Sequence, residues 1–121
     1  MINIPLDRNP KLLKYRPIEW KNGCLVLLDQ RQIPHAEVYL TLQTAEGVVT
    51  AIQEMVVRGA PAIGIAAAYC MVLAAQKAAE GVDFKFSNLE EAARKLIASR
   101  PTAVNLAWAV NQILEVARTL V

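Results

Sequence analysis

An arginine stands directly before a turn of small residues in Val57–Arg58–Gly59–Ala60–Pro61–Ala62–Ile63–Gly64. Gly59 and Ala60 carry so little side chain that their backbone N–H groups stay accessible. Pro61 suits the first turn of a helix, and a helix start carries partial positive charge. Arg58 adds a full charge with forked donors, which favours a phosphate or another anion. The alternative is a plain turn between helices with a solvated arginine, and the pattern alone favours neither.

The segment Ser99–Arg100–Pro101–Thr102–Ala103–Val104–Asn105–Leu106 repeats this arrangement. An arginine again stands beside a proline at a helix start, and Thr102 and Asn105 are suitable capping residues. In the simpler alternative, these two residues only cap the helix and Arg100 only covers surface.

The two arginines predict a single anion site if their helix starts lie at the same end of the fold. Each arginine follows one apolar helix and precedes a second helix that begins near a proline. We therefore expect Arg58 and Arg100 to converge on one concave patch, with the N–H groups of Gly59 and Ala60 pointing into it. These four are the predicted substrate-binding residues.

Other residues able to do chemistry are sparse. Cys24 and Cys70 lie among apolar neighbours and are expected to be small core residues. His35 is the only histidine, which excludes a histidine-based zinc site, and Asp29–Arg31 is expected to be a polar surface loop. The chain has no Ser–His–Asp arrangement, Walker-type phosphate loop or dinucleotide-binding fingerprint. We predict no metal site and no catalytic acid–base pair in these residues.

The composition indicates one folded domain. The chain has 121 residues, of which 55% are hydrophobic and 20% are charged, which excludes disorder of the whole chain. A net charge of +2 is too small for a typical nucleic-acid-binding protein, so no nucleic-acid partner is expected. No basic segment followed by an apolar one opens the chain, so no secretory signal is predicted. With only two cysteines, we expect a reducing, cytoplasmic setting.

The stretch 59–76 holds no charged residue and is long enough to raise the question of a membrane-spanning helix. Alanine and glycine dominate it, Pro61 lies near its start and Gln76 at its end. Alanine contributes little to membrane insertion compared with leucine, isoleucine or phenylalanine. We predict the buried central helix of a soluble core, and no membrane partner.

Residues 17–42 predict a small antiparallel sheet that follows an irregular arm at 1–16. Apolar and polar residues alternate in the expected strands, and Asn-Gly is a favoured two-residue hairpin turn. The expected strands and turn are Ile18–Lys21, Asn22–Gly23, Cys24–Leu28 and Val38–Leu42.

The hydrophobic period changes from two to 3.6 after residue 43, which predicts a helical bundle over 43–121. The expected helices run from 44 to 58, from 61 to 79, from 87 to 100 and from 102 onward. Thr44 is the expected N-cap of the first, and Ser87 with Glu90 forms a capping box for the third. The predicted fold class is α+β, a three-stranded antiparallel sheet followed by a four-helix bundle.

The last helix lacks a stop signal, because Thr119–Val121 offers no glycine, proline or polar tail. Its apolar surface is also wider than three preceding helices are expected to cover. We expect the chain to be cut at residue 121 inside a larger protein, although a helix that frays at a natural end gives the same pattern. The positions expected to be exposed, or buried against another chain, are Leu106, Ile113, Val116 and Leu120.

Three segments follow one another along the chain: Leu28–Asp29–Gln30–Arg31 with Pro34, then Val57–Tyr69, then Ser99–Leu106 with Trp108. In this order they resemble the N-terminal part of the methylthioribose-1-phosphate isomerase family. The resemblance extends from about Ile18 to Leu120. That family is related to the alpha, beta and delta regulatory subunits of the guanine-nucleotide exchange factor of translation initiation, and to ribose-1,5-bisphosphate isomerases.

The resemblance implies conversion of 5-methylthioribose 1-phosphate to 5-methylthioribulose 1-phosphate in methionine salvage, with no metal or organic cofactor. It also implies a Rossmann-like second domain that carries the catalytic Cys and Asp, with the active site between the domains. Arg58, Gly59, Ala60 and Arg100 match the family's substrate-binding positions. We expect these residues alone to be inactive. The expected partners are the sugar phosphate and the absent second domain, and the full-length protein is expected to be a homodimer.

Two other functions stay open. The first is a non-catalytic regulatory domain like those of the exchange-factor subunits. Two converging arginines favour the isomerase, because a scaffold does not need them. The second is a ribose-1,5-bisphosphate isomerase, although Asn105, Leu106 and Trp108 look more like the methylthioribose enzyme.

Overall fold

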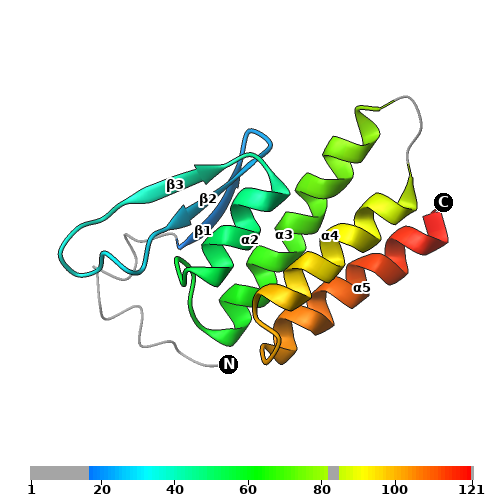
Figure 1. The fold of residues 1–121 in the computed structure, drawn as a ribbon. Helices are drawn as coiled ribbons and strands as arrows, with labels where there is room; N and C mark the ends of the chain where they lie inside the picture. Colours follow the sequence, from blue (N-terminus) through cyan, green and yellow to red (C-terminus); the bar gives the residue numbers. More distant parts are fainter. Residues whose placement is uncertain (1–16, 82–84, 121) are drawn as a thin grey trace, which may run out of the picture.

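The computed structural model describes residues 17–81 and 85–120, which form three strands followed by four helices (Figure 1). The strands are β1 (Ile18–Lys21), β2 (Cys24–Leu28) and β3 (Tyr39–Leu42). The helices are α2 (Ala45–Gln53), α3 (Ala60–Ala79), α4 (Phe86–Ser99) and α5 (Val104–Leu120). The predicted α+β fold class is confirmed. The predicted arm at 1–16 lies outside the described residues.

The sheet has the order β1-β2-β3, and both neighbouring pairs are antiparallel, as predicted. Asn22 and Gly23 join β1 to β2 with φ angles of 53° and 78°, the left-handed values that a type I′ turn requires. This turn sets a register in which Trp20 pairs with Leu25. Leu25 and Leu27 consequently share one face of the sheet, and both are fully buried.

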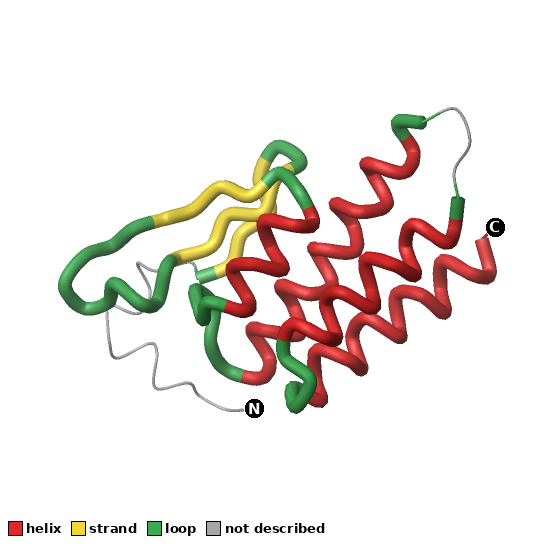
Figure 2. The backbone as a smooth tube through the Cα atoms, in the orientation of Figure 1, coloured by secondary structure: helices red, strands yellow, loops and turns green. Residues whose placement is uncertain are grey.

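Helix α3 lies at the centre of the fold, packed against β1, β2, α2, α4 and α5 (Figure 2). Gly64, Ala66 and Ala67 are buried in it, and their small size lets the neighbouring elements approach closely. By length and composition alone α3 is apolar enough to cross a membrane. In the fold, its apolar residues supply much of the core that the sheet and the other helices share.

The sheet covers α2 and α3 on one side, and α4 and α5 pack on the other side of α3 (Figure 2). Trp20 of β1 stacks on Tyr69 of α3, with ring centroids 5.2 Å apart and planes 8° apart. This contact fixes the sheet against the central helix.

Helix α2 ends at Gln53, and not at Arg58 as the sequence predicted. Met55 adopts a left-handed φ of 64°, which takes the chain out of the helix. Val56 and Val57 are buried although they lie outside the helix. Their apolar spacing was interpreted as helical, but the same burial is achieved by an irregular segment that turns inward.

The predicted helix starts are correct for α2 and wrong for α4. Thr44 caps α2, because its hydroxyl oxygen accepts a hydrogen bond of 3.0 Å from a backbone N–H in the first turn. The capping box Ser87–Glu90 does not form, since α4 begins at Phe86 and Lys85 is its N-cap residue. Phe86 packs against the core, which places the first turn ahead of the serine.

Helix α5 begins at Val104, two residues after the predicted Thr102. Leu106 is fully buried, contrary to the prediction that it is exposed or covered by another chain. Val116 agrees with that prediction, since 57% of it is exposed, and Ile113 is half-buried. The side chain of Leu120 lies outside the described residues.

Candidate functional site

The chain enters α3 through a segment whose backbone is held from two sides. The N–H of Val56 donates to the carbonyl of Ala51 at 2.9 Å, and its own carbonyl accepts from the N–H of Gln30 at 2.9 Å. Val57 is buried directly after it. Arg58 follows and is exposed, so the segment anchors the backbone and leaves the guanidinium in solvent.

Gly59 is the N-cap residue of α3 and has a φ of 90°, which residues with a side chain rarely adopt. Its carbonyl accepts from the N–H of Ile63 at 2.9 Å, which closes the first turn. No side chain caps this helix start, and its first turn contains no acidic residue. The partial positive charge at the start of α3 is therefore not neutralised by a carboxylate in that turn.

Arg100 follows the last residue of α4 and is half-buried. Its carbonyl accepts from the N–H of Ala103 at 2.9 Å, which leads the chain into α5. Its Nη1 is buried, yet it has no hydrogen-bond partner among residues 17–81 and 85–120. A buried donor without a partner costs about 1–3 kcal/mol, and more when it is charged. A ligand oxygen at this nitrogen would remove that cost.

The structure brings together the two helix starts that follow these arginines. Helices α3 and α5 run parallel and side by side, so both begin at the same end of the bundle (Figure 1). They approach so closely that a Cβ on Gly64 would lie 3.3 Å from the backbone oxygen of Asn105. The contact of both guanidinium groups with one ligand stays a prediction.

Charge at this end of the bundle has a positive and a negative component. The starts of α3 and α5 contribute partial positive charge, and neither has an acidic residue in its first turn. Helix α4 ends here, so its last carbonyl groups contribute partial negative charge. The hydroxyl of Ser99 donates to one of them, the carbonyl of Leu96. Arg58 and Arg100 add two full positive charges, which makes this end suitable for an anion.

Two cavities in the described part of the chain lie away from these arginines. One, of about 490 Å³, is on the outer face of the sheet and is lined by residues of β1, β2 and β3. The other, of about 750 Å³, lies between α2, α3 and α4. None of Arg58, Gly59, Ala60 and Arg100 lines either cavity, so the predicted patch coincides with neither.

The polar cluster after β2 differs from the predicted surface loop. Asp29 is only 2% exposed, and Arg31 binds it through a fork, with Nε to Oδ1 and Nη2 to Oδ2 both at 2.9 Å. This guanidinium lowers the pKa of the Asp29 carboxyl. Arg31 Nη1 also lies 3.4 Å from Glu54 Oε1. The sequence signal that could have predicted this ion pair was an aspartate and an arginine two residues apart, directly after an apolar strand.

The two cysteines occupy different environments. Cys70 is buried in α3, and burial raises the pKa of its thiol to about 12, which excludes a thiolate nucleophile at neutral pH. Cys24 is half-buried and lines the cavity on the outer face of the sheet, so it is not the core residue that the sequence predicted. His35 is exposed.

Residues 56–120 match the Initiation factor 2 subunit family, and this stretch contains both arginine segments and the two parallel helices. It makes up more than half of the 121 residues. The chain belongs to this family. The Initiation factor 2 subunit family match thus covers the part of the fold that carries all four predicted site residues, whereas the sheet lies outside it.

Relatives of the chain are isomerases. It is 53% identical over 102 residues to methylthioribose-1-phosphate isomerase 2 of Pseudothermotoga lettingae, which covers 84% of this chain and 29% of that protein. It is 54% identical over 108 residues to methylthioribose-1-phosphate isomerase of Pseudomonas syringae, covering 88% and 30%. The chain therefore spans less than a third of the length of these relatives.

Two solved structures share the fold. One is 5-methylthioribose 1-phosphate isomerase from Pyrococcus horikoshii, with a TM-score of 0.77 and 35% identity over 86% of this chain and 30% of that one. The other is translation initiation factor eIF-2B, subunit delta, from A. fulgidus, with a TM-score of 0.71 and 35% identity, covering 86% and 31%. The same fold is thus found in an isomerase and in a translation factor.

Proposed function

We propose that this chain is the N-terminal substrate-binding part of an aldose–ketose isomerase that converts 5-methylthioribose 1-phosphate to 5-methylthioribulose 1-phosphate in methionine salvage. The observation that carries the proposal is the buried Nη1 of Arg100 without a partner among the described residues, next to the start of α5. Identity above 50% to relatives named for this activity supports the choice of substrate. Arg58, Gly59 and Ala60 complete the proposed site.

The chemistry explains why such a site is useful. An aldose–ketose conversion moves a proton between adjacent carbons while charge develops on oxygen. A phosphate held in one place aligns the sugar carbons with the acid and the base, which lowers the entropic part of the barrier. A donor that is buried and fixed before the substrate arrives requires little reorganisation. Arg100 meets this description, and exposed Arg58 adds charge from the solvent side.

The proposed partners follow from the same assignment. We propose that the sugar phosphate is the ligand, that a second domain supplies the acid and the base without a cofactor, and that the complete protein is a cytoplasmic homodimer. The net charge of +2 supports a function that involves neither nucleic acid nor a membrane surface.

The second candidate is a regulatory domain without catalysis, which the likeness to the delta subunit of the translation factor favours. For a regulatory domain, replacing either arginine should not change the affinity for a sugar phosphate. A ribose-1,5-bisphosphate isomerase is the third candidate, and it predicts preference for a ligand with two phosphates.

Titration calorimetry of the 121-residue chain separates these functions. We expect binding of 5-methylthioribose 1-phosphate, weaker binding of ribose 1,5-bisphosphate, and no conversion of either by this chain. Arg100→Ala should raise the Kd about 30-fold or more, because a buried donor to the phosphate is lost. Arg94→Ala is the matched control, since Arg94 is an exposed arginine of α4. Absence of binding at millimolar ligand, or equal binding by Arg100→Ala, contradicts the proposal.

A chimera tests the catalytic context. The matching 108-residue part of the Pseudomonas syringae isomerase is replaced by this chain. We expect the chimera to catalyse the conversion, and expect Arg58→Ala or Arg100→Ala to lower kcat/KM about 30-fold or more. A folded chimera without activity would instead favour the regulatory domain.

A further inference from the structure

Asp29 is the one buried acidic residue in the described part of the chain, and the proposed substrate contacts do not use it. Its carboxylate accepts the forked pair from Arg31 and, at 3.0 Å, the backbone N–H of the same residue. Its own N–H donates to the carbonyl of Val38 at 2.7 Å. The turn 29–31 is therefore folded around this carboxylate.

Two bonds join the turn 29–31 to the segment that leads to the anion site. The backbone N–H of Gln30 donates to the carbonyl of Val56 at 2.9 Å. The side chain of Arg31 pairs with Glu54 through Nη1 and Oε1 at 3.4 Å. Both acceptors lie in 54–58, the irregular stretch between the end of α2 and Gly59.

The stretch 54–58 begins as the C-cap of α2 and continues to Gly59 outside any helix. Met55 has a φ of 64°, a left-handed conformation that is unfavourable for a residue with a side chain, and 42% of it is exposed. Such conformations persist where the surroundings enforce them. Here the N–H groups of Glu54, Met55 and Val56 donate to carbonyls in the last turn of α2, which is a helix C-cap arrangement. The contacts with the turn 29–31 and the burial of Val56 and Val57 hold the part of the stretch that continues from this cap to Gly59.

We propose that Asp29 is a positioning residue for the anion site: by holding Arg31 and the turn 29–31, it keeps 54–59 in the conformation that presents Arg58 and the start of α3 to the substrate. The identity of the ligand rests on the proposed function, whereas the coupling between Asp29 and 54–59 does not. If Asp29 acts on global stability alone, its replacement should loosen all parts of the fold in proportion.

Amide hydrogen exchange measured by NMR on the 121-residue chain tests the coupling without a ligand. In Asp29→Asn we expect the amides of Met55, Val56 and Gly59 to exchange about 10-fold faster, with the amides of α4 little changed. The matched control is Ala93→Gly, a buried position of α4 that lowers stability without touching the turn. Equal acceleration at 54–59 in both variants would overturn the proposal. If Asp29→Asn does not fold, Arg31→Lys keeps the charge without the fork and should show the same local pattern.

A double-mutant cycle on the affinity for 5-methylthioribose 1-phosphate tests the consequence. Asp29→Asn should raise the Kd about 10-fold in the parent chain and have a clearly smaller effect when Arg58 is already alanine, because part of the effect of Asp29 acts through Arg58. Equal effects in both backgrounds, or none in the parent, overturn the positioning role. A parent chain that does not bind contradicts the proposed function, and the exchange experiment then decides the coupling by itself.

Discussion

A guanidinium nitrogen that is buried without a hydrogen-bond partner destabilises the fold that contains it. Nη1 of Arg100 is such an atom among the described residues, whereas Arg31 is paired with Asp29 and Glu54. The two arginines therefore do different things. Arg31 satisfies a buried carboxylate and stabilises the chain, whereas the buried Nη1 of Arg100 lowers stability and, under the proposed function, is the donor to the ligand.

Replacing Arg100 by methionine should separate these effects. Arg100→Met keeps the length of the side chain and removes the unpaired donor, so we expect the Tm to stay the same or to rise. The stabilisation that 5-methylthioribose 1-phosphate gives the parent chain should be lost in the variant. Differential scanning fluorimetry with and without the ligand measures both, with Arg94→Met as control. A lower Tm together with unchanged ligand stabilisation would show that Arg100 is structural.

We expect the thiols of the two cysteines to differ in their rate of alkylation. Burial holds the pKa of the Cys70 thiol at about 12, so it should resist iodoacetamide at pH 8, whereas half-buried Cys24 should be alkylated. Above about pH 9, the thiol of Cys70 ionises more readily in the unfolded chain than in the folded chain. The contribution of the buried neutral thiol to the free energy of unfolding should therefore be lost as the pH rises from about 9 to about 12. Peptide mass spectrometry after timed alkylation checks the contrast, and equal labelling of both thiols in the folded chain would contradict it.

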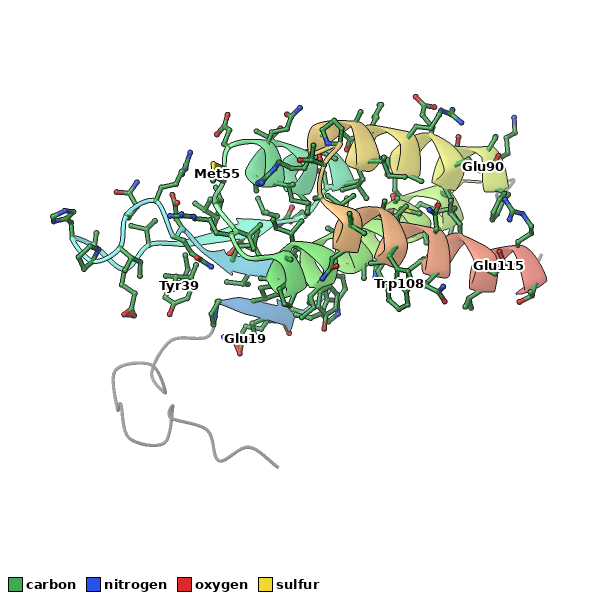
Figure 3. The ribbon with its side chains drawn as sticks, turned by 90° about the horizontal axis from the view of Figure 1, so that it is seen from below. Glu19, Tyr39, Met55, Glu90, Trp108 and Glu115 are labelled. Carbon is green, nitrogen blue, oxygen red and sulfur yellow. The ribbon has the colours of Figure 1, made fainter. Side chains whose placement is uncertain are left out.

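At the scale of the elements, the site depends on the parallel packing of α3 and α5. The crossing is close because Gly64 has no side chain to separate α3 from the backbone of Asn105. Arg100 is placed by the end of α4 and Arg58 by the segment after α2, so four helices define one end of the bundle. On the opposite face of α5, Figure 3 shows Trp108 directed away from the other described helices, with 65% of it exposed.

Gly64→Ala tests this packing. The added Cβ would lie 3.3 Å from the backbone oxygen of Asn105, so α5 must shift, and we expect a loss of about 1–3 kcal/mol in the free energy of unfolding. The Kd for 5-methylthioribose 1-phosphate should rise because the starts of α3 and α5 move apart. Gly81→Ala is the matched control, since the nearest atom to its Cβ, at 3.6 Å, is in ordinary contact. Urea unfolding and calorimetry measure the two effects, and a neutral Gly64→Ala would contradict them.

At the scale of the whole molecule, the sheet and the bundle are joined by apolar packing and by the buried carboxylate of Asp29. The inner face of the sheet packs on α2 and α3, while Asp29 and Arg31 connect the end of β2 to the end of α2. The ion pair depends on a charged carboxylate, so this connection depends on pH.

Acid should weaken this connection selectively. The pKa of Asp29 is lowered from 3.8, chiefly by the hydrogen bonds from Arg31, so its contribution to stability is fully present above about pH 4. That contribution should be lost as the pH falls below 4 through the lower pKa of the folded state. Asp29→Asn should therefore be less stable than the parent at pH 7, and the difference should shrink towards pH 2. Urea midpoints across this range check it, and a constant difference would contradict it.

Patterns that act over a few residues were predictable from the sequence. The Asn22–Gly23 turn, the N-cap at Thr44 and the helix that begins near Pro61 follow from local backbone preferences and nearby hydrogen bonds. The α+β class followed from the change of hydrophobic period after residue 43. The segments around Arg58 and Arg100 were recognisable too, because arginine beside small residues and proline at a helix start is a local signal.

Only the tertiary structure decided which of these segments meet and which side chains lose contact with water. The burial of Asp29 and the unpaired nitrogen of Arg100 depend on elements far away in the sequence, and α2 ends at Gln53 where the chain turns inward to bury Val56 and Val57. Val56 fits a helical stripe as well as an irregular buried segment, since hydrophobic spacing reports burial and not backbone angles. The parallel contact of α3 and α5 arises from packing over 40 residues of separation, which no local pattern specifies.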